Sequence, residues 1–126
     1  MAGVSSPPLR RVKTYTASSG YVYQYYFVGQ RDAKFQQEAA TEFIFDVTRD
    51  RHAIFAFSVF LTAGAVNDWA RRHGRALSDP ERYAATKMRL LRGFDELGAN
   101  DLRQESRQLA VTAEMLEELL SELGVA

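Results

Sequence analysis

One lysine stands among apolar residues in the middle of the chain. On a helical wheel, residues 78–97 gather an apolar arc that contains Lys87 together with Tyr83, Leu90, Leu91, Phe94 and Leu97. Three arginines fall outside this arc: Arg82, Arg89 and Arg92. A buried ammonium must meet a carboxylate, reach water or lose its proton, because burying an unpaired charge is costly. Lys87 is therefore a candidate for anion binding or for base chemistry. The alternatives are a structural salt bridge, or an aliphatic stem that lies along the apolar surface while the ammonium reaches water.

Two carboxylates interrupt an otherwise apolar strand pattern between residues 42 and 49. The two-residue period of a strand puts Glu42 and Asp46 on one face with Ile44 and Thr48, opposite Phe43, Phe45 and Val47. If that face turns toward the helices, Glu42 or Asp46 is the partner of Lys87. If it turns toward solvent, the two carboxylates form an ordinary polar face.

Aromatic residues crowd a second strand pattern over residues 21–28. Tyr21, Tyr23, Tyr25 and Phe27 share one face of that strand. Such a row can stack nucleic-acid bases or wall a ligand pocket, and it can equally be core under a helix. A small-ligand site between sheet and middle helix would comprise Lys87, Asp46, Glu42, Tyr23, Tyr25 and Tyr83.

A basic cluster lies where a shorter helix is expected to end. Arg71, Arg72 and Arg75 surround His73 near Gly74. Cations suit the negative end of a helix dipole, and they could also form a patch for phosphate or nucleic acid.

The composition excludes several kinds of chemistry. The chain has no cysteine, which rules out disulfides, thiolate metal sites and cysteine nucleophiles. Sixteen basic and sixteen acidic residues cancel, so no net charge draws the protein toward nucleic acid or an anionic membrane. No nucleotide-binding, hydrolase or metal-binding motif occurs. We therefore expect no cofactor and no metal site, and the sequence favours no class of enzyme.

The expected elements are strands first and helices afterwards. Turn chemistry at Ser18-Ser19-Gly20 predicts a hairpin over residues 13–17 and 21–28, and a second hairpin is predicted over 42–49 and 53–61. Residues 29–40 between them read as a loop with one helical turn in 33–40. Helices are predicted over 64–73, 79–97 and 112–123, the second opened by a capping box at Ser78-x-x-Glu81, with a short edge strand at Leu109–Val111. This order predicts an α+β fold with an antiparallel sheet of about four strands and helices on one face.

The remaining expectations concern organisation and setting. Residues 1–12 are predicted to be a flexible tail before a single domain over 13–126. No apolar run is long enough to span a bilayer, which favours a cytoplasmic protein, and the predominance of arginine over lysine suggests a GC-rich bacterial source. Apolar residues on both faces of the strand over 53–61 favour a homodimer.

For function, the sequence favours a non-catalytic binding or assembly module, whose partner would be a small anionic ligand or another protein. The first alternative is a receptor or enzyme with a pocket on Lys87. The second is a nucleic-acid binder that uses Arg71, Arg72, Arg75 and the tyrosine-rich strand.

Overall fold

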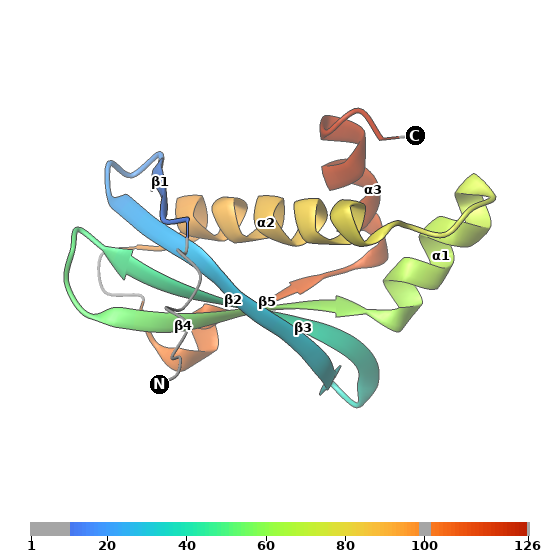
Figure 1. The fold of residues 1–126 in the computed structure, drawn as a ribbon, viewed down its shortest axis with the longest axis horizontal. Coiled ribbons are helices and arrows are strands. Elements are labelled where there is room, and N and C mark those ends of the chain that lie inside the picture. Colours follow the sequence, from blue (N-terminus) through green and yellow to red (C-terminus); the bar gives the residue numbers. More distant parts are fainter. Residues whose placement is uncertain (1–10, 99–101, 126) are drawn as a thin grey trace, which may run out of the picture.

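The protein folds as a five-stranded sheet covered on one side by helices, as the computed structural model shows for residues 11–98 and 102–125 (Figure 1). The elements follow in this order: β1 (Lys13–Thr16), β2 (Val22–Phe35), β3 (Glu38–Arg49), β4 (Ile54–Thr62), α1 (Ala63–His73), α2 (Asp79–Glu96), a short 3-10 helix (Gln104–Arg107), β5 (Gln108–Val111) and α3 (Ala113–Glu122). Most of the predicted tail and part of the connection around Asn100-Asp101 lie outside the described residues.

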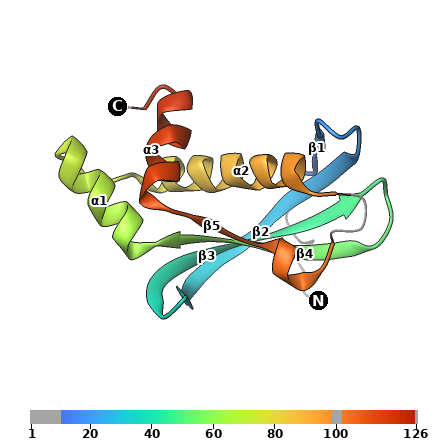
Figure 2. The ribbon, with the colours of Figure 1, turned by 180° about the vertical axis from the view of Figure 1, so that it is seen from behind.

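The predicted α+β class is confirmed. Strands β1 to β4 are antiparallel neighbours in sequence order, and the predicted edge strand is present as β5. This fifth strand pairs with β4 in parallel, which makes the sheet mixed (Figure 2). None of the helices in the described part of the chain combines the length and apolar character needed to cross a membrane.

The helix boundaries agree with the capping signals. The Ser78 hydroxyl accepts from the Glu81 amide at 3.3 Å, and the Glu81 carboxylate accepts from the Ser78 amide at 2.9 Å, which opens α2 with the predicted capping box. At the start of α3 the Thr112 hydroxyl accepts from the Met115 amide at 3.3 Å, and α1 ends at Gly74, whose φ of 72° is the left-handed conformation that glycine adopts readily.

The predicted loop over residues 29–40 is wrong, because β2 and β3 continue through it as one long hairpin. Their turn consists of Gln36 and Gln37, with φ of 50° and 69°. Two positive φ angles define the tight turn that suits a twisted hairpin, and such turns usually carry Asn-Gly. A register shift between Phe27 and Gly29 adds a β-bulge, so the strand pattern of β2 changes faces midway.

The core lies between the sheet and α2. Alternate residues of the strands point toward the helices and are buried: Tyr23, Tyr25, Phe43, Phe45, Val47, Phe57 and Val59. From α2, Leu90 and Phe94 meet them. The tyrosine-rich face of β2 is therefore core under a helix and not a surface on which bases could stack.

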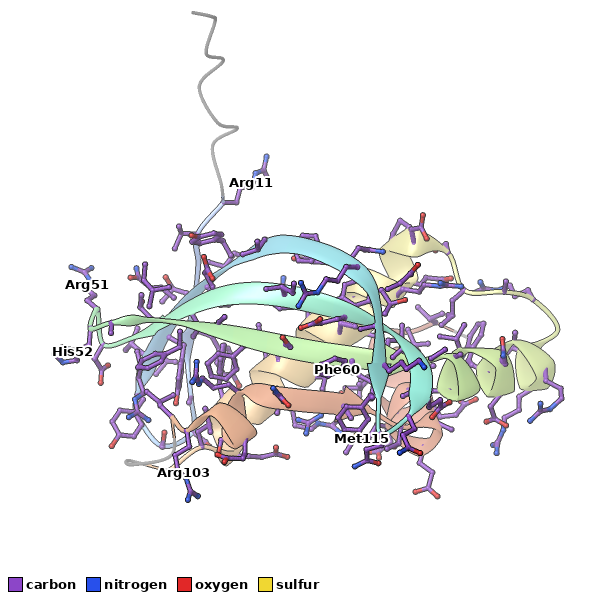
Figure 3. All side chains as sticks on the ribbon, turned by 90° about the horizontal axis from the view of Figure 1, so that it is seen from below. Arg11, Arg51, His52, Phe60, Arg103 and Met115 are labelled. Atoms are coloured by element: carbon purple, nitrogen blue, oxygen red, sulfur yellow. The ribbon has the colours of Figure 1, made fainter. Side chains whose placement is uncertain are left out.

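The other face of the sheet carries no helix in the described part of the chain (Figure 3). Val22 and Ile54 are exposed on this face, and the relative exposure of Ile54 is 63%. Phe60, labelled in Figure 3, is nevertheless buried because the ring of Phe35 packs on it at 5.2 Å. The sheet thus leaves a mixed apolar and polar face open.

Candidate functional site

Lys87 lies on the side of α2 that faces the beginning of the sheet. Its side chain is half-buried, and burial lowers its pKa below the ordinary value of 10.5. The second cause is Lys13, whose ammonium lies beside that of Lys87 and repels it. The sequence predicted an inward lysine, and the structure adds a second cation next to it.

Strand pairing brings Lys13 to this place. Lys13 stands directly opposite Tyr25 in the β1–β2 ladder, and opposite residues of an antiparallel pair share a face. Tyr25 points toward α2, so Lys13 does also. The chain has three lysines, and two of them meet here. Sequence analysis missed Lys13 because the register of β1 could not be read from four residues.

A pocket of about 260 Å³ opens beside these lysines, where β1 begins and leaves the edge of β2 unpaired. It is lined by Arg11, Lys13, Tyr25, Tyr26, Phe27 and Tyr83. The rings of Phe27 and Tyr83 meet edge to face at 5.1 Å and form an apolar wall. Arg11 lies just before β1 (Figure 3) and adds a third cationic side chain.

Two phenols at this pocket are held in their protonated form. Burial raises the pKa of Tyr83, and burial followed by the neighbouring Tyr83 raises that of Tyr25, which is only 4% exposed. Both hydroxyls therefore stay protonated at neutral pH and can donate hydrogen bonds.

No carboxylate compensates these cations within residues 11–98 and 102–125. The ion pairs there involve other arginines and His73, and none includes Arg11, Lys13 or Lys87 within 4.0 Å. An uncompensated cluster of cations beside two phenolic donors has the chemistry of an anion site.

Replacing Lys87 by methionine should stabilise the protein free of ligand. The folded state lowers the pKa of Lys87, so its protonated form weakens folding below that pKa, and this penalty fades as pH rises toward 10.5. We expect the free energy of unfolding to rise by about 0.5 kcal/mol at pH 7 and low salt, with the gain vanishing above pH 10.5. Urea unfolding of Lys87→Met measures this, with exposed Lys34→Met as the control. A clear loss of stability would show that Lys87 anchors the fold.

Of the two alternatives for Glu42 and Asp46, the structure shows the polar face: both carboxylates lie on the open side of the sheet, so neither pairs with Lys87. Glu42 is 2.8 Å from Arg31 Nε and accepts from the Ser58 hydroxyl at 2.6 Å. Burial alone would raise the pKa of Glu42, but the hydrogen bonds from Arg31 and Ser58 outweigh it and lower that pKa. Asp46 accepts from the Tyr26 hydroxyl at 2.9 Å. The alternative, a polar face turned away from the helices, is what the structure shows.

Tyr23, another expected site residue, is part of the core. It is fully buried, and its ring stacks on that of Phe94 at 4.2 Å with an interplanar angle of 1°. Of the expected ligand-site residues, the structure therefore brings together Lys87, Tyr25 and Tyr83.

The arginines near the end of α1 are compensated by carboxylates. Arg71 Nη2 and Arg72 Nε lie 2.7 Å and 2.9 Å from the oxygens of Asp68. Arg75 makes a two-pronged pair with Glu81 at 2.8 Å and 2.9 Å. Arg75, followed by the Ser78 amide, lowers the pKa of Glu81 to about 2. Paired in this way, these arginines do not form the free phosphate patch that the sequence left open.

Among the described residues, no three histidine or carboxylate side chains lie close enough together to hold a metal ion.

Comparison with known proteins identifies no family: no family model matches the chain, and neither a curated protein nor a solved structure is significantly similar to it.

Proposed function

We propose that this protein is a non-catalytic binding module that holds a small oxyanion in the pocket beside Lys13 and Lys87. The observation that carries the proposal is a pocket lined by Arg11 and Lys13, with Lys87 nearby, whose three cationic side chains have no carboxylate within 4.0 Å in the described structure. A bound anion with two negative charges would offset their repulsion. It would also accept hydrogen bonds from Tyr25 and Tyr83.

The pocket wall favours binding over catalysis. Its described side chains supply cations, phenols and one phenyl ring, and they include no carboxylate, histidine, serine or threonine. General acid–base chemistry needs a group that titrates near the working pH, whereas the two phenols have raised pKa values and remain neutral. Fixed donors and cations of this kind hold a ligand in one orientation.

The test is thermal stability in phosphate and sulfate, compared with chloride at the same ionic strength. A ligand at about ten times its dissociation constant stabilises by about 1.4 kcal/mol, or roughly 5 °C in a domain of this size. We expect a saturable rise with phosphate or sulfate that is lost in Lys13→Met and Lys87→Met and kept in Lys34→Met. Equal shifts in chloride, or in all three variants, would contradict the proposal.

We further propose that the protein forms a homodimer through the open face of the sheet. The exposed apolar residues Val22 and Ile54 support this, because they lie on one face that the described α-helices leave bare. Light scattering at micromolar concentration should give twice the monomer mass, and Ile54→Asp should return it to the monomer. A monomer mass for the unaltered protein would refute this assembly.

A bacterial source and a cytoplasmic location stay predictions from composition.

A further inference from the structure

A second pocket, of about 420 Å³, lies between the far end of the β2–β3 hairpin, the start of α1 and the first turns of α2. Its floor is apolar and built largely from small side chains, with Leu61 and Val66 as the larger members. The polar side chains in its wall are Asp32, Thr41, Asn67 and Arg82. This pocket shares none of its lining residues with the one beside Lys13.

Arg82 in this wall has no carboxylate partner among the described residues, unlike the other arginines of α2. Its Nε atom is buried and has no hydrogen-bond acceptor, and no carboxylate of the described chain lies within 4.0 Å of it. Arg89 and Arg92 on the same helix both pair with glutamates. A buried donor without an acceptor is costly, so an acceptor from outside the chain would be favourable here.

Asp32, on β2, supplies the opposite charge to the same pocket. It stands across from Thr41 in the β2–β3 ladder, and both side chains line the pocket. Asp32 forms no ion pair with any described residue, Arg82 included, so the two charges are more than 4.0 Å apart. The pocket therefore has in its wall a cation and an anion that do not pair with each other, together with an apolar floor of small side chains.

We infer that this pocket binds a small zwitterion, an amino acid or a dipeptide, independently of the anion proposed for the other site. The ligand carboxylate pairs with the Arg82 guanidinium, whose planar fork suits two carboxylate oxygens. The ligand ammonium pairs with Asp32, and Thr41 and Asn67 offer neutral hydrogen bonds. The small side chains of the floor leave room for a short aliphatic chain between the two charges.

Isothermal titration with zwitterions of increasing charge separation tests the inference. The probes are glycine, β-alanine, γ-aminobutyrate and dialanine, with propionate and ethylamine as singly charged controls. We expect saturable binding of at least one zwitterion, and at least tenfold weaker binding of both controls. Arg82→Gln and Asp32→Asn should each weaken the zwitterion at least tenfold.

Matched variants guard against a general loss of folding. Arg92→Gln removes a paired arginine from the same helix, and Asp79→Asn removes an exposed carboxylate, so both should bind like the unaltered protein. Arg82→Gln should unfold at the same temperature as the parent or higher, since it removes a buried donor. Absence of binding by all four zwitterions, equal binding of propionate, or unchanged binding by Arg82→Gln would overturn the inference.

Discussion

Replacing Phe94 by alanine should lower the free energy of unfolding by about 3–5 kcal/mol. Phe94 is fully buried at the centre of the aromatic core. Its ring stacks on Tyr23, meets Phe57 edge to face at 5.7 Å and lies 5.9 Å from Tyr25. Truncation removes these ring contacts, and one with Tyr15 at 6.2 Å, and leaves a cavity that stacked rings on a sheet cannot close easily. Urea unfolding followed by the fluorescence of buried Trp69 measures the loss.

The matched control for this change is Phe35→Ala. Phe35 is also aromatic and contacts Phe60, but it lies on the open face at the end of the hairpin and is only half-buried. Phe35→Ala should lower the free energy of unfolding by about 1 kcal/mol, because Phe35 buries less apolar surface than Phe94 does. A similar cost for both variants would mean that the core is not centred on the stack of Phe94 and Tyr23.

Replacing Arg89 by methionine should lower the free energy of unfolding by about 2 kcal/mol, which is the usual contribution of a hydrogen bond from a charged donor. Arg89 is only 8% exposed, and its Nε donates to the Ala110 carbonyl at 3.0 Å. Its Nη1 lies 3.3 Å from Glu96 Oε1. The side chain thus joins α2 to β5, and methionine keeps the apolar stem while removing that link.

Arg92→Met serves as the control, since Arg92 lies one turn further along α2 and pairs with Glu118 and Glu122 at 3.8 Å and 3.3 Å. Ion pairs of this exposure contribute about 0–1 kcal/mol. Chemical denaturation should therefore separate the two variants clearly. An equal loss of stability in the two variants would mean that the hydrogen bond from Arg89 to β5 contributes no more than an exposed ion pair.

Local signals were enough to predict the helices. The capping box at Ser78 and Glu81 and the terminal Gly74 depend on residues a few positions apart, so a single sequence shows them. The β2–β3 turn gave no such signal. Gln36 and Gln37 adopt positive φ without glycine or asparagine, because the paired strands on either side hold them there.

The sequence alone could not predict contacts between elements that are far apart in the chain. The helical wheel placed Arg89 outside the apolar arc, yet Arg89 is buried and Lys87 only half-buried. The reason is β5, whose position beside β4 gives the Arg89 guanidinium a carbonyl to reach. In the same way, Lys87 could be identified as unusual, but its neighbour Lys13 depends on the register of β1.

The parallel pairing of β5 with β4 has a consequence for the order of folding. Strands β1 to β4 pair with their immediate neighbours along the chain, so their loops close at little entropic cost. Strand β5 follows α1 and α2 in the chain, so a much longer loop must close before it docks against Ser58–Leu61. The meander is thus suited to nucleate, and the C-terminal strand and helix to join last and to open first in native-state hydrogen exchange.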